Sequence, residues 1–150
     1  MDVSECGLAS LSWTHLPLPT QTVRSESAEL DRANGFLRQA ADWLRAYFGN
    51  RSPLPRLPPL VPSGTEFQKS VWRQLLAISP GTTTTYGEIA RDLGMPGASR
   101  AVGQAVGANP LPILIPCHRV LAAGGKLGGY SSGLRRKRWL LAHEGLAWIS

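Results

Sequence analysis

Cys117 and His118 form the only adjacent pair of a thiol and an imidazole in the sequence. A free cysteine has a pKa of about 8.5, so only a small fraction of it is the nucleophilic thiolate at neutral pH. An imidazole can accept the thiol proton, and a carboxylate behind the imidazole would fix its tautomer and stabilise its cationic form. Glu144 is the best candidate among the few acidic residues of the second half. The pair predicts a nucleophilic cysteine, against the alternative of a structural cysteine buried beside a histidine.

The segment around this pair limits how the two side chains can act. Neighbouring residues on a regular strand point to opposite faces, so contact between Cys117 and His118 requires a turn or a bridging water. Upstream, Asn109-Pro110 predicts a turn. The apolar run 113–115 lies between prolines and is too short for a helix, so we expect a buried extended segment that delivers the cysteine.

Three helices are expected upstream of the cysteine. A capping-box sequence at Thr65 opens an apolar periodic run, and a second one at Thr85 opens a short helix that runs through Leu93 and stops at Gly94. The third helix, 98–107, consists almost entirely of small residues and carries one charge, Arg100. Two short helices joined by a turn rich in glycine and proline have the outline of a helix-turn-helix. The alternative is a small-residue helix packed tightly against a neighbour.

A proline-rich segment, 51–64, divides the chain. Five prolines within ten positions exclude helix and central strand there and predict an extended connector. We therefore expect one part over residues 1–63 and a second over 64–150. The first part shows a weak strand signal over 11–15 and one amphipathic helix over about 28–48.

Positive charge is concentrated in the second part. Residues 1–63 hold six acidic and six basic side chains, whereas residues 64–150 hold four acidic and ten basic ones and so carry the whole net charge of +6. This distribution predicts a polyanionic partner, against the alternative of a generally basic surface. The densest basic run, 135–138, lies in a helix expected over 134–143. We interpret the run as a phosphate-contacting or solvated helix face.

The composition indicates a soluble globular protein. With 43% hydrophobic and 17% charged residues the chain is not disordered, and no apolar run reaches the roughly 18–20 residues that span a bilayer. The N-terminus lacks the pattern of a secretory signal. Cys6 and Cys117 lack metal-ligand spacing. We expect two free thiols in a reducing compartment, the cytoplasm, near the nucleoid, against the alternative of a structural Cys6–Cys117 bridge.

A longer motif surrounds the cysteine. Pro116-Cys117-His118-Arg119-Val120 follows Asn109-Pro110 and precedes Gly129-Tyr130 and the run 140–145. In this context the pentapeptide resembles the O6-alkylguanine-DNA alkyltransferase family, and the match runs without obvious gaps from about Gly64 to Gly145. Residues 1–63 are similar only in outline to the family's N-terminal ribonuclease-H-like domain, in abbreviated form. The resemblance implies an α+β fold, with a small strand-and-helix domain before a mainly helical C-terminal domain that contains a helix-turn-helix.

The resemblance implies catalytic roles for five residues. Cys117 would be the nucleophile that takes an alkyl group from guanine O6 in one in-line displacement, and His118 would be its base through a bound water. Glu144 would hold the histidine, and Asn109 would brace the turn beside the cysteine. Tyr86 would line the pocket and donate to guanine N3, where negative charge develops as the alkyl group leaves.

Other residues would contact the base and the DNA. Arg100 would be an arginine finger that fills the gap left when the damaged nucleotide rotates out of the duplex. Tyr130 and Ser131 match a loop that closes over the base, by stacking and by hydrogen bonding near O6. Arg119, grouped with these residues, would support the turn beside the cysteine rather than touch the substrate. Apolar or backbone walls are implied at Pro112 and Val120.

The expected function is DNA repair by an enzyme that acts once. Its partner would be double-stranded DNA, bound through the minor groove with little dependence on sequence. We expect a monomer with no cofactor and no membrane partner, and no metal, because the first part lacks the cysteine and histidine set that binds zinc in some members. Two alternatives stay open: a non-catalytic lesion binder or helix-turn-helix regulator, and a cysteine hydrolase that uses Cys117 and His118.

Overall fold

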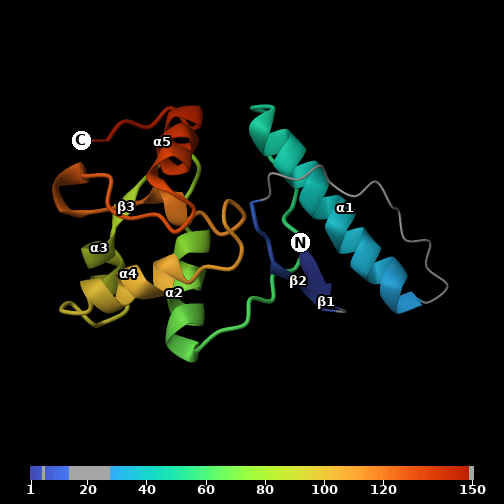
Figure 1. Cartoon of the computed structure of the whole chain (residues 1–150), viewed down its shortest axis with the longest axis horizontal. Helices are drawn as coiled ribbons and strands as arrows, with labels where there is room; N and C mark the ends of the chain where they lie inside the picture. Colours follow the sequence, from blue (N-terminus) through green and yellow to red (C-terminus); the bar gives the residue numbers. More distant parts are fainter. Residues whose placement is uncertain (5, 14–27, 149–150) are drawn as a thin grey trace. The chain divides into compact units, whose positions relative to one another are not determined.

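The computed structural model describes residues 1–4, 6–13 and 28–148, and the chain divides into two compact units, Met1–Ser63 and Gly64–Ser150 (Figure 1). The fold is mixed α/β, with two small sheets and five α-helices in the described part. Its elements are β1 (Asp2–Ser4), β2 (Gly7–Ser10), α1 (Ala28–Phe48), α2 (Glu66–Leu76), β3 (Thr84–Thr85), α3 (Tyr86–Asp92), α4 (Ser99–Gly107), the 3₁₀ turn η1 (Cys117–Arg119), β4 (Val120–Leu121), the 3₁₀ turn η2 (Ala123–Gly125) and α5 (Leu134–His143). None of the described helices is long and apolar enough to cross a membrane.

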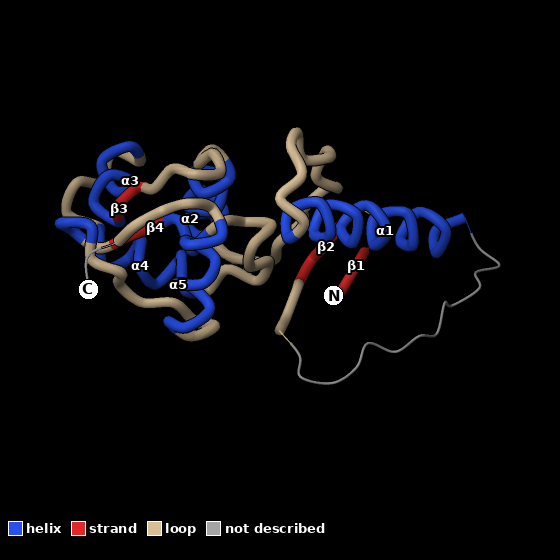
Figure 2. The backbone as a smooth tube through the Cα atoms, turned by 90° about the horizontal axis from the view of Figure 1, so that it is seen from above, coloured by secondary structure: helices blue, strands red, loops and turns tan. Residues whose placement is uncertain are grey.

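In the first unit, the antiparallel hairpin of β1 and β2 packs along α1 (Figure 2). The predicted helix over 28–48 is confirmed, and its buried face includes Ala40, Trp43 and Tyr47. Leu8 of β2 is fully buried, and its backbone exchanges hydrogen bonds with Pro59 and Val61 of the connector. The connector forms no helix, as predicted.

The weak strand signal over 11–15 was wrong for residues 11–13, which lie in no strand, whereas positions 14 and 15 lie outside the described residues. The second strand runs over Gly7–Ser10 instead. Gly7 is its first residue and has a φ of 152°, and a Cβ there would collide with the Pro59 carbonyl. Glycine at this position lets the backbone of β2 approach the Pro59 carbonyl closely. The strand therefore forms before the alternating residues 11–15 and not over them.

Three helices of the second unit pack together, with α2 and α3 both against α4 (Figure 1). Both predicted capping boxes are confirmed at the threonines that precede α2 and α3. The Thr65 side chain accepts from the Gln68 amide at 3.2 Å, and the Thr65 amide donates to the Gln68 side chain at 2.8 Å. The buried Trp72 indole of α2 donates to the Ala105 carbonyl of α4 at 2.8 Å, so small residues on α4 allow close packing.

A short parallel pairing joins two distant segments of the second unit. Thr84 pairs with Val120 and Thr85 with Leu121, so β3 lies beside β4 (Figure 2). The residue after β3 is Tyr86, and the residues before β4 are the 3₁₀ turn of Cys117–Arg119. This pairing, which the sequence analysis did not predict, brings the start of α3 next to the cysteine.

The segment before Cys117 is buried, as predicted, but it is a tight turn and not an extended segment. The Ile115 amide donates to the Leu111 carbonyl at 2.8 Å, and Ile113 has a φ of 75°. Asn109 holds the turn closed, because its Nδ2 donates to the Ile115 carbonyl and its Oδ1 accepts from the Leu111 amide, each at 2.9 Å. A left-handed backbone at a β-branched residue costs about 1–3 kcal/mol, so sequence preferences favoured the extended form.

Candidate active site

Cys117 is the first residue of the 3₁₀ turn η1 and is only 3% exposed. The chain bends here, so Cys117 and His118 do not lie on a regular strand. Burial raises the pKa of the Cys117 thiol, against the lowering influence of the Asn109 side chain, the local backbone, the Lys137 charge and the Tyr130 hydroxyl. The resting group is therefore a thiol that needs a base before it can attack.

His118 and Glu144 form a buried pair behind the cysteine. The His118 Nε2 lies 2.8 Å from Glu144 Oε1, with the two side chains 0% and 3% exposed. A carboxylate only accepts hydrogen bonds, so Nε2 carries the proton and Nδ1 is the basic nitrogen. Burial lowers the pKa of His118, although Glu144 raises it, and the charges of Arg119 and Lys137 lower it further. The imidazole is thus neutral at pH 7 and able to accept a proton.

Glu144 also binds Arg119 through two hydrogen bonds. Arg119 Nε donates to Oε2 and Nη2 donates to Oε1, both at 2.8 Å, while Nη1 donates to the Ile78 carbonyl at 2.6 Å. The Gly81 amide adds a fourth bond to the carboxylate at 3.2 Å. The Arg119 guanidinium is 5% exposed and is held inside the unit, where it ties the end of α5 to the cysteine's turn.

A cavity of about 150 Å³ opens between α4 and the segment 129–131. Its walls come from α3, α4 and that segment: Tyr86, Gly103, Val106, Gly107, Gly129, Tyr130 and Ser131. Cys117 is not among these lining residues, but it interacts with both tyrosines of the cavity and raises the pKa of each, so the sulfur lies next to lining side chains. Pro112 and Val120 are buried and are not among the lining residues.

The two tyrosines that line this cavity differ in the surroundings of their hydroxyl groups. Tyr86 donates to the Gly129 carbonyl at a long 3.4 Å, and burial raises its pKa, so the phenol stays protonated. The Tyr130 hydroxyl is buried beside Cys117 and lacks a hydrogen-bond partner of normal geometry among the described residues. Gly128 has a φ of 65°, and a Cβ there would lie 3.3 Å from the Tyr86 hydroxyl oxygen, so a glycine is required at this wall.

Arg100 does not join this buried cluster. It is exposed, in the first turn of α4, three residues before the cavity-lining Gly103. Residues three apart on a helix lie on one face, so Arg100 extends from the same face of α4 that forms the cavity wall. An arginine at this place can reach a ligand that enters the cavity from outside.

Lys137 is the functional candidate that the sequence analysis missed. Its side chain is fully buried, and its Nζ donates to the Val120 carbonyl at 2.6 Å and to the Gly129 carbonyl at 3.1 Å. The interpretation of 135–138 as an outward face was therefore wrong at this position, although Arg135 and Arg138 are exposed. One signal could have revealed it: Lys137 precedes Leu140 by three residues and Leu141 by four, which is the spacing of the buried face.

The comparisons with known proteins match the part of the chain that contains Cys117. The family model of the 6-O-methylguanine DNA methyltransferase DNA-binding domain matches residues 66–146. A methylated-DNA–protein-cysteine methyltransferase of Methanosarcina acetivorans is 54% identical over 110 residues, which cover 73% of this chain and 70% of that protein. The enzyme of the same name from Shigella flexneri is 50% identical over 106 residues, covering 70% of this chain and 61% of that protein.

Solved structures give the same result. The crystal structure of Mycobacterium tuberculosis OGT in complex with DNA has a TM-score of 0.68 and 50% sequence identity, over 71% of this chain and 66% of that chain. The chain thus spans between about three fifths and seven tenths of these relatives. The resemblance seen around Cys117 is confirmed, and the chain belongs to the methylated-DNA–protein-cysteine methyltransferase family.

Proposed function

We propose that this chain repairs DNA directly, by moving an alkyl group, methyl above all, from O6 of a guanine in double-stranded DNA to the sulfur of Cys117. One observation carries the proposal: Cys117 lies buried next to the cavity-lining Tyr130, with the His118–Glu144 pair following it in the chain, in a member of this family. In this scheme neither water nor a cofactor removes the alkyl group from the thioether that forms on Cys117. Each chain would therefore act once.

The reaction would proceed as a single displacement. The thiol proton passes to Nδ1 of His118, through a water where the two do not touch, and Glu144 stabilises the imidazolium. The thiolate attacks the alkyl carbon, so an S–C bond forms as the C–O6 bond breaks. The electron pair of that bond moves into the guanine ring, and the ring takes up a proton. A buried site favours this step because the displaced charge stays near fixed dipoles.

The hydroxyl group of Tyr86 would be the proton donor to the leaving guanine. Its hydroxyl makes only a 3.4 Å bond to the Gly129 carbonyl, which a better acceptor such as guanine N3 can replace. The raised pKa keeps the phenol protonated until it is needed. Tyr130 and Ser131 would cover the base from the opposite wall, where both line the cavity.

The face of α4 that lines the cavity would also bind DNA. We assign α3, the turn after it and α4 as a helix-turn-helix whose second helix enters the minor groove, because the small residues of α4 suit a narrow groove. Arg100 would occupy the place of the rotated nucleotide. The excess of basic residues after residue 63 supports phosphate contacts that do not depend on sequence.

The first unit, Met1–Ser63, would be the abbreviated counterpart of the family's ribonuclease-H-like N-terminal domain, and the second would bind DNA and carry out alkyl transfer. The neutral charge of residues 1–63 gives it no evident part in phosphate binding. We propose a monomer in a reducing cytoplasm, which the free thiols Cys6 and Cys117 support.

The proposal is tested by mixing the protein with an excess of an oligonucleotide duplex that contains O6-methylguanine. We expect the intact mass to rise by one methyl group per chain, and peptide mapping to place that group on Cys117. Binding of the duplex without any change in mass would contradict alkyl transfer and favour a lesion binder.

Replacing Glu144 by glutamine is expected to slow methyl transfer by roughly 100-fold or more, the usual contribution of acid–base catalysis. Both carboxylate oxygens accept from two donors each, so an amide NH₂ at either position would face Arg119 or Gly81. His118 would lose the charge that stabilises its cation. The rate constant of methylation, followed by mass spectrometry well below the unfolding temperature, measures this effect.

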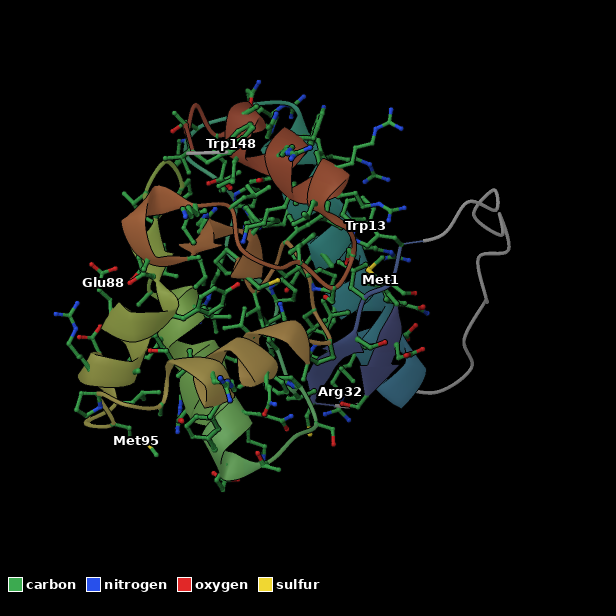
Figure 3. The ribbon with its side chains drawn as sticks, turned by 60° about the vertical axis from the view of Figure 1, so that its left-hand side comes forward. Met1, Trp13, Arg32, Glu88, Met95 and Trp148 are labelled. Carbon is green, nitrogen blue, oxygen red and sulfur yellow. The ribbon has the colours of Figure 1, made fainter. Side chains whose placement is uncertain are left out.

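Glu88→Gln is the matched control for that variant. Glu88 lies exposed on the outer side of α3 (Figure 3), where it caps the helix and touches no group of the active site. Its loss is expected to cost at most about 1 kcal/mol of stability and to leave the rate unchanged. Equal rates for the two variants would remove Glu144 from the mechanism.

A further inference from the structure

Lys137 is the largest fully buried side chain of the second unit, and the reaction described above gives it no role. It lies in the first turn of α5, and its Nζ bridges two carbonyls that belong to different segments. Val120 directly follows the cysteine's 3₁₀ turn, and Gly129 belongs to the wall of the cavity. The side chain thus fastens the nucleophile's turn to the pocket wall.

Stability alone does not explain a lysine at this place. Burying an ammonium group is costly, and the positive end of the helix dipole lies in the first turn of a helix, where a cation is disfavoured. Burial accordingly lowers the pKa of Lys137 to about 8, while the charge of Cys117 raises it. A methionine of similar length would fill the space without that cost. The lysine is therefore best explained by an anionic partner that exists in one state of the site.

The charged groups around Lys137 identify that partner. Arg119, whose charge acts on His118, is neutralised by Glu144 through two hydrogen bonds. Lys137 lowers the pKa of Cys117 and also that of His118, where its charge is the smallest contribution. An ammonium group has three donors, and two of them reach carbonyl oxygens. The third makes no hydrogen bond among the described residues, and the Val120 carbonyl that Nζ binds lies three residues after Cys117 in the chain.

We propose that Lys137 is a positioning residue for alkyl transfer: its ammonium group ties the turn of Cys117 to the pocket wall and balances the charge of the Cys117 thiolate. The proposal rests on the proposed function for its role in repair. Its electrostatic part concerns the free protein and can be measured without DNA. In this view His118 removes the proton and Lys137 holds the resulting anion in place.

The test is the reactivity of Cys117 toward iodoacetamide as a function of pH, in a Cys6→Ser background where it is the only thiol. We expect Lys137→Met and Lys137→Gln to shift the alkylation profile to higher pH, so that the reactive thiolate at pH 7 falls roughly tenfold or more. Glutamine retains a donor for one carbonyl but no charge, so it separates electrostatics from fastening. Arg138→Met, which removes an exposed charge from the next position of α5, is expected to leave the profile unchanged.

Methyl transfer from the O6-methylguanine duplex is then measured on the same variants, with circular dichroism to verify folding. We expect Lys137→Met and Lys137→Gln to lose methyl transfer by a factor similar to their loss of thiolate. An unshifted alkylation profile in Lys137→Gln would overturn the proposal, whatever happens to repair, because a purely structural lysine leaves the titration of the thiol unchanged. A shifted profile in a protein whose parent does not accept methyl groups would uphold the electrostatic role and contradict the proposed function.

Discussion

Replacement of Cys117 by serine is expected to abolish methyl transfer while the protein still binds DNA that contains O6-methylguanine. An alcohol is a far weaker acid than a thiol, so a neutral imidazole such as His118 cannot generate its anion at pH 7. Serine is close in size to cysteine and can bond to the same Asn109 side chain, so the turn should keep its shape. The loss is therefore one of chemistry and not of folding.

Intact-mass spectrometry and a binding titration at fixed salt concentration check this expectation together. Cys6→Ser is the matched control, because it removes the exposed thiol of the first unit and should leave one methyl group per chain after reaction. Methyl transfer to another residue in the Cys117→Ser variant would contradict the assigned nucleophile. Loss of binding as well as transfer would show that the substitution disturbs the site itself.

The local elements of the second unit were predictable because their signals lie within a few residues. Thr65 and Thr85 each stand three residues before a side chain that accepts a hydrogen bond from the threonine's own amide. The starts of α2 and α3 can therefore be predicted from the sequence. The bounds of α5, Leu134–His143, were likewise predicted. Capping and periodicity act over one or two turns and need no knowledge of the tertiary fold.

The features that complete the site depend on contacts between distant segments. The pairing of β3 with β4 joins residues about 36 positions apart, from Thr84 to Val120. Strands of two residues are too short to show the alternation of apolar and polar side chains from which a strand is predicted. The left-handed Ile113 is disfavoured by its own side chain and is imposed by Asn109 across the turn. Lys137 was placed outside because a run of four basic residues usually faces water.

The buried charges of the site explain why one cysteine can be held unreactive and still be used. Burial keeps Cys117 protonated and His118 neutral, so the resting protein carries no charge at either reacting atom. The paired Glu144 and Arg119 fix the base without adding net charge. Transfer requires both the removal of the thiol proton and an electrophile held in the cavity. Such an arrangement protects a nucleophile that is used once.

Replacing Arg100 by alanine is expected to slow the methylation of Cys117 by duplex DNA by roughly 30- to 1,000-fold while leaving reaction with a free O6-alkylguanine base nearly unchanged. A base inside the duplex must rotate out before it can reach the sulfur of Cys117, a residue that is 3% exposed, and lost stacking costs a few kcal/mol. A guanidinium that fills the vacated space recovers part of that cost. The expected 30- to 1,000-fold loss of rate corresponds to about 2–4 kcal/mol. A free base has no stack to leave, so it does not need the arginine.

Two companion variants separate the finger from general attraction to phosphate. Arg91→Ala removes an exposed arginine from the last turn of α3, so it should weaken DNA binding slightly and leave the ratio of the two rates unchanged. Arg100→Lys keeps the charge but loses the planar donor face, and we expect it to remain slow on duplex DNA. Equal losses on duplex and free base in Arg100→Ala would show that the residue acts on the pocket. Recovery by lysine would show that Arg100 contributes charge alone, because a compact ammonium cannot stack in place of the missing base.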